Sequence, residues 1–129
     1  MCNKPKYYKC EICGNIVSMI HDAGIVPFCC GKAMTELVAN TSDGASEKHV
    51  PVIEVNGNEV TVTIGSTLHP MLEEHHIEWI ILVTEKGRSY RCLNHTGDPI
   101  AKFTICEDDK VKAAYEYCNL HGLWMAEYK

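Results

Sequence analysis

Residues 77–84 read IEWIILVT, and this stretch decides the fold. Apolar side chains occupy both faces of the strand that it would form, which is typical of a central strand covered on both sides. Outward from it, six further short segments have strand character and are separated by turns. They are residues 52–55, 59–64, 88–93, 100–106, 111–117 and 123–128. Seven short strands without a long amphipathic helix predict an all-β fold, a seven-stranded immunoglobulin-like β-sandwich.

Four cysteines near the start of the chain form two pairs. Cys10 and Cys13 are separated by two residues, whereas Cys29 and Cys30 are adjacent. So short a segment cannot bury enough apolar surface to fold without a staple, and four thiolates make a tetrahedral metal site. Zinc and iron both accept this donor set. The adjacency of Cys29 and Cys30 is unusual for a zinc ribbon and resembles desulforedoxin, which implies iron.

The composition changes at residues 40–46, which read NTSDGAS. Small polar residues of this kind are typical of a linker or a surface loop. The change predicts two domains. A small desulforedoxin-like domain with the four cysteines occupies residues 1–37, and the β-sandwich domain occupies residues 38–129.

A second set of metal-binding residue types lies in the sandwich segment. Cys118 and His121 lie three positions apart and are followed by Gly122, so a thiolate and an imidazole can face one ion across a tight turn. His49, His69 and His75 fall in predicted loops near strand ends. Four imidazoles and one thiolate exceed the four ligands of a structural zinc site, whereas iron accepts six ligands and would keep one position open.

The remaining histidines and cysteines receive a structural interpretation. His21, His76 and His95 have no partner at a recognisable spacing. Cys92 and Cys106 are expected to be small buried side chains on strands. Cys2 is expected to be a free terminal thiol.

Composition limits the partners and the compartment. A formal net charge of −5 without a Lys/Arg cluster argues against nucleic acid. No apolar run approaches the roughly 18–20 residues that span a bilayer, and the N-terminus lacks a signal-peptide pattern. Eight cysteines, four of them clustered, indicate metal binding in a reducing compartment rather than disulfides. We therefore expect a soluble cytoplasmic protein that binds neither nucleic acid nor membranes.

Three motifs together resemble those of the superoxide reductases. They are Glu47-Lys48-His49-Val50-Pro51, His69-Pro70-Met71 with His75-His76-Ile77-Glu78-Trp79, and Cys118-Asn119-Leu120-His121-Gly122. The N-terminal cysteines mark the two-iron branch, the desulfoferrodoxins, and the resemblance covers essentially the whole chain. It implies a catalytic iron with His49, His69, His75 and His121 in a square plane and Cys118 as the axial ligand, and a second iron held by Cys10, Cys13, Cys29 and Cys30. His76 stands where the family commonly has an aromatic residue.

The resemblance implies that ferrous iron reduces superoxide to hydrogen peroxide, with one electron and two protons and without releasing dioxygen. Lys48 is expected to attract the anion and to help deliver a proton through water. Glu47 is expected to serve as an oxygen ligand of ferric iron after turnover. A homodimer and a rubredoxin-like electron donor are also implied. A superoxide dismutase and a non-catalytic electron-transfer or interaction module remain as alternatives.

Overall fold

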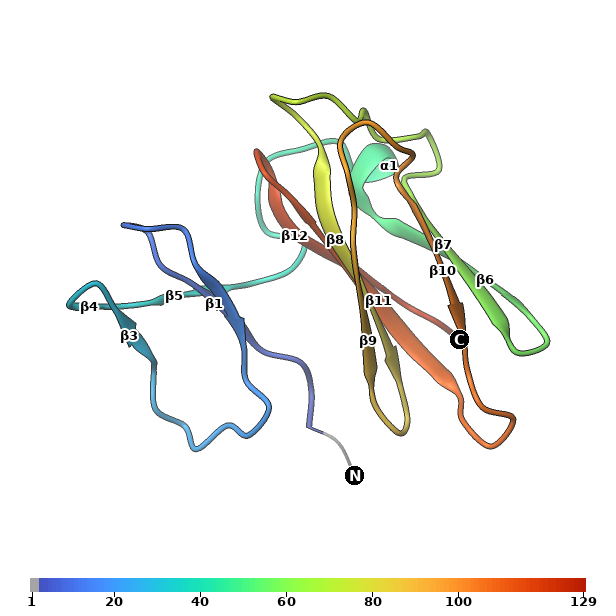
Figure 1. Ribbon diagram of the computed structural model, residues 1–129, viewed down its shortest axis with the longest axis horizontal. Helices are drawn as coiled ribbons and strands as arrows, with labels where there is room; N and C mark the ends of the chain where they lie inside the picture. The colour runs from blue at the N-terminus through green and yellow to red at the C-terminus, as the bar shows by residue number, and fades with distance from the viewer. Residues whose placement is uncertain (1–2) are drawn as a thin grey trace. The chain divides into compact units, whose positions relative to one another are not determined.

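A computed structural model describes residues 3–129. Contacts divide this part of the chain into two compact units, Asn3–Val38 and Ala39–Lys129. Antiparallel strands build both units (Figure 1). No helix among the described residues is long and apolar enough to cross a membrane.

The smaller unit has a three-stranded sheet and a two-stranded ribbon. In the sheet, β1 (Tyr7–Lys9) lies between β2 (Ile16–Ser18) and β5 (Thr35–Leu37). The ribbon pairs β3 (Phe28–Cys29) with β4 (Lys32–Ala33). Three buried residues, Tyr8, Cys10 and Met34, form its core cluster, and the partly buried Met19 and Cys29 pack against them. A core of this size is too small to hold the unit by hydrophobic burial alone.

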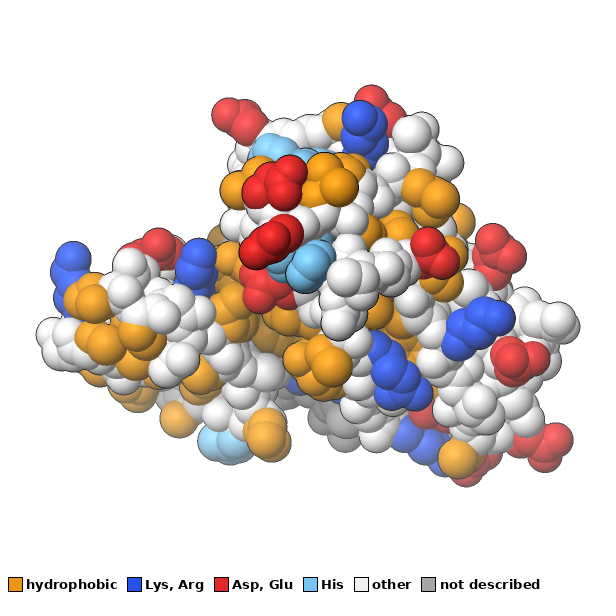
Figure 2. Space-filling model, turned by 45° about the horizontal axis from the view of Figure 1, so that its top comes forward, with side chains coloured by type: hydrophobic (Ala, Val, Ile, Leu, Met, Phe, Trp, Pro, Cys, Tyr) orange, Lys and Arg blue, Asp and Glu red, His pale blue; other side chains and the backbone are white. Residues whose placement is uncertain are grey.

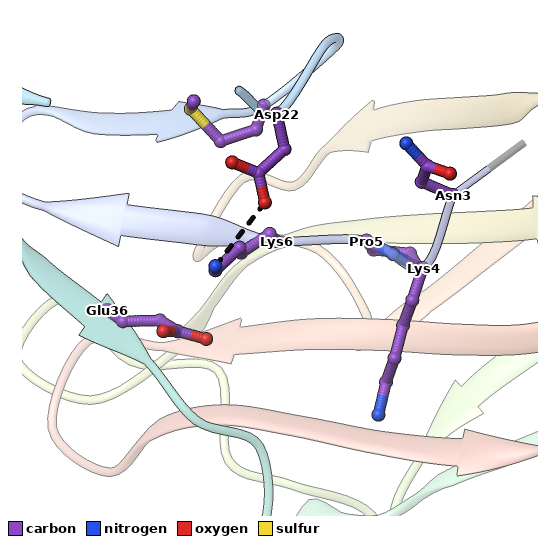
Figure 3. A pocket seen from close by; sticks show the side chains of 7 residues that line it. Asn3, Lys4, Pro5, Lys6, Asp22 and Glu36 are labelled. Atoms are coloured by element: carbon purple, nitrogen blue, oxygen red, sulfur yellow. Dashed lines mark hydrogen bonds and ion pairs between the residues drawn. The ribbon is translucent and has the colours of Figure 1, made fainter. Parts of the chain in front are cut away.

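A polar pocket lies beside the sheet of the smaller unit. It has a volume of about 390 Å³, and its lining includes Lys4, Lys6, Asp22 and Glu36. The Lys6 ammonium points toward the Asp22 carboxylate at 3.3 Å and joins the start of β1 to the loop after β2 (Figure 3). This partly exposed ion pair is screened by water and contributes little to stability.

The larger unit is a sandwich of two antiparallel sheets. One sheet has the order β10-β7-β6 and the other β12-β11-β8-β9. The strands are β6 (Pro51–Asn56), β7 (Glu59–Ile64), β8 (Ile77–Thr84), β9 (Arg88–Cys92), β10 (Ile100–Thr104), β11 (Val111–Cys118) and β12 (Gly122–Glu127). All seven predicted strands are confirmed to within two residues at either end, and so is the all-β sandwich.

Strand β8 is central, as its apolar sequence predicts. It lies between β9 and β11, and its Ile80 and Leu82 are fully buried. Val60 and Val62 of β7 belong to the same core, which fills the space between the sheets. Alternation with threonine along β7 places these valines on the inner face.

Strand pairing gathers several strand ends at one end of the sandwich. Cys118, the last residue of β11, pairs with Ile77 at the start of β8 and with Gly122 at the start of β12. In the other sheet, Pro51 at the start of β6 pairs with Ile64 at the end of β7. The short helix α1 (Ser46–His49) precedes β6 at this same end. Every sandwich residue proposed from the sequence as a ligand lies in or next to these strand ends.

One expectation from the sequence is wrong. Cys92 and Cys106 are exposed, not buried. Cys92 ends β9, which is an edge strand, and Cys106 lies beyond the end of β10. Residues 40–46 are largely exposed, as a surface loop would be, and Asn40 bonds this loop to the sandwich. Its backbone N–H donates to the Leu123 carbonyl, and its side chain exchanges two hydrogen bonds with the backbone of Met125.

Candidate metal centres

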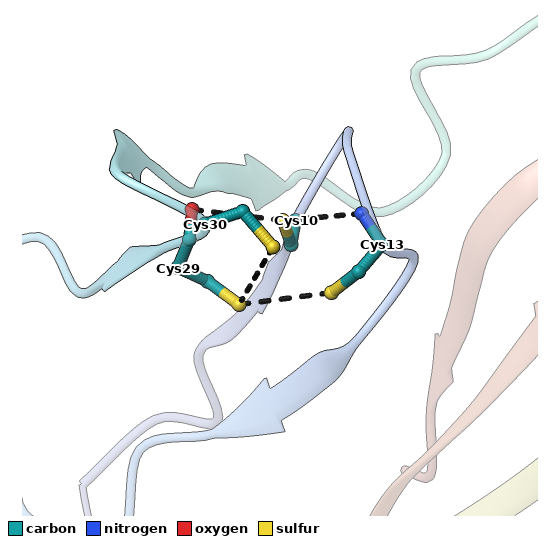
Figure 4. A group of neighbouring side chains, drawn as sticks. All are labelled: Cys10, Cys13, Cys29 and Cys30. Carbon is teal, nitrogen blue, oxygen red and sulfur yellow. Dashed lines mark hydrogen bonds between the residues drawn. The ribbon is translucent and has the colours of Figure 1, made fainter.

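The four cysteines of the smaller unit direct their sulfurs toward one another (Figure 4). The Sγ atoms of Cys13 and Cys29 are 3.7 Å apart, and those of Cys29 and Cys30 are 4.0 Å apart. All four sulfurs, including that of Cys10, lie within 4.8 Å of one another. A metal–sulfur bond of about 2.3 Å places neighbouring sulfurs about 3.8 Å apart in a tetrahedron. The cluster therefore fits one tetrahedral ion.

A left-handed turn allows the adjacent Cys29 and Cys30 to face the same point. Successive side chains of an extended strand point to opposite faces. Cys30 has a positive φ of 54°, which L-residues rarely adopt, and Gly31 follows with a φ of 74°. The turn redirects the Cys30 side chain toward the loop that carries Cys10 and Cys13.

Protonation in this cluster also favours a cation. Hydrogen bonds from the backbone N–H groups of Cys13 and Ile12 lower the pKa of the Cys10 thiol to about 6. The side chains of Cys13, Cys10 and Cys29 raise the pKa of the Cys30 thiol to about 12. Without a cation, only the first of these thiols ionises readily. A bound metal ion supplies the positive charge that keeps all four as thiolates.

Four histidines of the sandwich form a ring of imidazoles. Neighbouring ring centroids are 4.7 Å apart for His49–His69, 4.6 Å for His69–His75, 5.1 Å for His75–His121 and 4.9 Å for His121–His49. The diagonal between His49 and His75 is longer, at 6.4 Å. Four nearly equal edges and a longer diagonal describe a square.

The hydrogen bonds of these rings leave lone pairs facing the centre of the square. Nδ1 of His49 lies 2.8 Å from the Ala45 carbonyl oxygen, and Nδ1 of His69 lies 2.7 Å from that of Pro70. A carbonyl only accepts, so each Nδ1 carries the proton and each Nε2 has a lone pair. These two Nε2 atoms are 3.2 Å apart, which is repulsive unless a cation lies between them.

His75 leads to the same conclusion, because its Nε2 atom is buried and has no hydrogen-bond partner among residues 3–129. A buried imidazole nitrogen without a partner is costly unless it binds a metal ion. The residues present therefore fit a metal.

Cys118 lies on the interior side of the square. Its Sγ atom is 3.5 Å from Nε2 of His69 and 3.9 Å from Nδ1 of His121, and its side chain is fully buried in the apolar core. Burial raises the pKa of the Cys118 thiol. Burial also lowers the pKa of His49, and it lowers the pKa of His69 to about 4. These two imidazoles therefore stay neutral and able to bind metal, whereas Cys118 needs a nearby cation to become a thiolate.

Asn119 ties together two of the turns that carry these residues. Its Oδ1 accepts a hydrogen bond from the His76 backbone N–H at 2.8 Å. Its Nδ2 donates to the Glu74 carbonyl at 3.0 Å, and its backbone N–H donates to the His76 carbonyl at 3.2 Å. The two residues on either side of His75 are thus fixed to the turn that contains Cys118 and His121.

Trp124 and the segment before α1 enclose His49 and His121. The Trp124 indole stacks on the His49 ring at 4.9 Å, and its Nε1 donates to the His121 carbonyl at 3.0 Å. The Ser42 hydroxyl donates to the same carbonyl. A Cβ atom on Gly44 would lie 3.2 Å from Cε1 of His49, so only glycine fits this approach comfortably. Residues 42–45 thus form one wall of the centre.

Glu47 and Lys48 are exposed on α1, directly before His49. The turn after β7 holds this helix, since the Thr67 N–H and the Ser66 hydroxyl donate to the Glu47 carbonyl. A Cβ atom on Gly65 would overlap the Thr67 carbonyl and lie 2.8 Å from that of Lys48. Figure 2 shows histidine side chains at the surface of the sandwich unit with carboxylates beside them.

The structure thus brings together each residue set that the sequence proposed for metal binding. His49, His75, His121 and Cys118 have ligand atoms within 4.8 Å of one another, and His69 joins them through its short contacts. Sequence reasoning assigned no role to Asn119, Trp124 or Ser42. Asn119 and Ser42 contact residues 43 and 79 positions away, so local spacing carries no signal of them.

Comparison with known proteins accounts for both centres. The desulfoferrodoxin family matches residues 41–127, and its N-terminal domain matches residues 2–37. The chain belongs to the desulfoferrodoxin family. A desulfoferrodoxin of Nitratidesulfovibrio vulgaris is 52% identical over 128 residues, which cover 98% of this chain and 99% of that protein.

Solved structures of superoxide reductases are similar to this member of the desulfoferrodoxin family. The superoxide reductase of Treponema pallidum has a TM-score of 0.83 and 38% identity, and the match covers 96% of this chain and 99% of that one. The one-iron superoxide reductase of Giardia intestinalis has a TM-score of 0.56 and 36% identity, and covers 64% of this chain and 98% of its own. The four-cysteine cluster and the cluster of four histidines and Cys118 correspond to the iron sites of a desulfoferrodoxin.

Proposed function

We propose that this protein is a superoxide reductase, which converts superoxide to hydrogen peroxide and consumes one electron and two protons. One observation carries the proposal: four imidazoles form a square, and the Cys118 thiol lies on its interior side. Five protein ligands leave one coordination position of iron for a substrate. The family and the similar superoxide reductase structures support this activity.

We propose His49, His69, His75, His121 and Cys118 as the ligands of the catalytic iron, and Cys10, Cys13, Cys29 and Cys30 as those of the second iron. Iron held in the larger site would supply the electron that superoxide takes up. Cys118 is the one anionic group among the five residues, so a ferrous centre keeps a net positive charge that favours an anion. Buried surroundings leave that charge poorly screened.

We assign catalytic roles to Lys48 and Glu47 at the solvent side of the centre. Lys48 has no ion-pair partner among residues 3–129, so its charge is available to attract superoxide. Water near this ammonium supplies a proton to the departing peroxide. Glu47 offers a carboxylate oxygen on the same helical turn, a hard donor suited to the oxidised metal.

Product stoichiometry tests the reductase assignment. The iron-loaded protein, reduced by an artificial donor, receives a known flux of superoxide while peroxide and dioxygen are measured. A reductase forms one peroxide per superoxide and no dioxygen, whereas a dismutase forms one peroxide per two superoxides with dioxygen. Cys13→Ser is the matched control, since it alters the four-cysteine site and leaves the larger centre intact. Dioxygen release in the dismutase ratio would overturn the proposal.

We further propose a functional division at residues 1–37 and 38–129, with a rubredoxin-like protein as the electron donor.

We also propose a homodimer, which is supported by apolar side chains on the smaller unit. Ile20 is 98% exposed, and Ile25 and Phe28 are 74% and 72% exposed. We place the protein in the cytoplasm because no disulfide joins cysteines among residues 3–129, and thiolate metal sites persist in reducing compartments. Sedimentation velocity of the holoprotein tests the dimer.

A further inference from the structure

A pocket outside both iron sites is lined by three residues of metal-binding type. It has a volume of about 450 Å³ and lies at the end of β9, where its lining includes His76, Cys92 and His95. Cys92 is an exposed free thiol, and both histidines are half-buried. None of the three has a part in the proposed reaction.

The distance between the His76 and His95 rings is in the range found for imidazoles that bind one ion. Their centroids are 5.8 Å apart, with an interplanar angle of 42°. In the square of the larger centre, ring centroids are between 4.6 and 6.4 Å apart. Nδ1 of His76 lies 2.9 Å from the Leu72 carbonyl oxygen, so this nitrogen carries the proton and Nε2 keeps a lone pair.

Backbone pairing fixes the elements that carry these residues. Cys92 pairs with Trp79 across β8 and β9, and the Leu93 N–H donates to the Glu78 carbonyl. The next residues form an ordered turn in which the Asn94 side chain accepts hydrogen bonds from the Thr96 N–H and hydroxyl. The start of β8 therefore lies beside the turn that carries His95.

We propose that His76, Cys92 and His95 form a third metal site, which binds a d¹⁰ cation such as Zn²⁺. Two imidazole nitrogens and a thiolate suit this class of ion, with water as the fourth ligand, whereas Mg²⁺ and Ca²⁺ prefer oxygen donors. Cys92 lines the same pocket as the two histidines, and in the proposed site it binds the ion as a thiolate while its thiol proton passes to solvent. Because His76 also holds the Leu72 carbonyl, the ion would tether the turn before His75 to β9.

Zinc titration of the iron-loaded full chain, followed by calorimetry, tests this site. His95→Ala and Cys92→Ser each remove one ligand, and neither residue contacts the iron ligands. His21→Ala is the matched control, because His21 is an exposed histidine in the smaller unit. We expect one zinc per chain, with affinity at least about 10-fold lower in both ligand variants and unchanged in His21→Ala. Equal affinity in all four proteins, or retained affinity in either ligand variant, would overturn the proposal.

Thiol alkylation provides an independent readout. Cys92 and Cys106 are both exposed, so both react with iodoacetamide in the absence of zinc. We expect zinc to protect Cys92 and leave Cys106 reactive, as measured by peptide mass spectrometry. Equal protection of the two thiols, or iron release in proportion to zinc uptake, contradicts a separate site.

Discussion

Asn119 contributes no ligand atom to the catalytic centre, but it decides where His75 lies. Its side chain forms hydrogen bonds with the backbone on both sides of His75. These bonds hold the loop in one position, which an isolated loop would not keep. Trp124 has a similar role for His49, because the stacked indole limits the rotation of the imidazole. The geometry of the square thus depends on side chains behind the ligands as well as on the ligands themselves.

Replacing Asn119 by Ala removes the hydrogen bonds to the His76 N–H and the Glu74 carbonyl. We expect a loss of about 1–3 kcal/mol in the free energy of unfolding. Iron affinity should fall by about 10- to 100-fold, with a change in the visible spectrum of the oxidised centre. Denaturant titration and chelator competition measure these effects. Asn58→Ala, in the hairpin at the other end of the sandwich, is the control. An unchanged spectrum in Asn119→Ala would show that the position of His75 does not depend on the hydrogen bonds of Asn119.

Lys48→Ile separates capture of the anion from metal binding. Iron should stay bound, because Lys48 lies outside the square, while the second-order rate with superoxide falls about 10-fold at low ionic strength. The salt dependence of that rate should weaken as well. Pulse radiolysis of the reduced protein measures both, with Lys102→Ile as the exposed lysine control on β10. Glu47→Ala should leave the encounter rate nearly unchanged. A Lys48→Ile rate equal to the parent's contradicts the steering role.

At the scale of elements, two turns at one end of the sandwich are joined by hydrogen bonds that lie beyond the pairing of β8 with β11. Asp109 lies in the turn between β10 and β11, and its Oδ1 accepts the backbone N–H groups of Lys110 and of Lys86 in the turn between β8 and β9. A hydrogen bond from Thr84 contributes most to lowering the pKa of Asp109. The ionised carboxylate therefore holds two turns together at the end of the sandwich away from the metal centre.

This lowered pKa predicts the pH range in which Asp109 stabilises the fold. A carboxyl group with a folded-state pKa below its unfolded value stabilises the fold above the unfolded value, about 3.8, and loses that effect as pH falls through the folded value. Asp109→Ala should therefore lower the urea midpoint equally at pH 7 and pH 5. Asp108→Ala, which breaks only an exposed ion pair with Lys86, is the control and should have a smaller effect. If the difference in urea midpoint between Asp109→Ala and the parent already shrinks between pH 7 and pH 5, the stabilising role of the ionised Asp109 carboxylate is refuted.

At the scale of the whole molecule, the two units depend on metal to different extents. The core cluster of the smaller unit joins three buried residues, whereas the sandwich core is continuous across both sheets. Loss of the four-cysteine ion should therefore unfold residues 3–38 and leave the sandwich folded. Hydrogen exchange of Cys13→Ser tests this, with loss of protection in β1 and β5 and retained protection in β8 and β11. Full protection of β1 in the metal-free unit would mean that the smaller unit folds without its metal ion.

The strands and the four-cysteine cluster could be predicted because both have local signals, whereas the five ligands of the larger centre were implied by the resemblance of three motifs to those of the superoxide reductases. Alternation along residues 59–64 and the unbroken apolar run at 77–84 follow from the two-residue period of a strand. Cysteine and histidine spacing next to glycine reveals a tight turn. The predicted burial of Cys92 was wrong, because an edge position is decided only when distant strands meet. The contact between Asn40 and Met125 has no local signal for the same reason.

The contacts of residues 40–45 determine where this protein can be divided. A shortened gene product beginning at Glu47 would keep every proposed catalytic ligand and still lose the Ser42 bond to the His121 carbonyl and the Ala45 acceptor of His49. One beginning at Ala39 would keep them all. The polar stretch that looks like a dispensable spacer belongs to the catalytic module, so the natural seam for truncation, fusion or domain exchange lies between Val38 and Ala39.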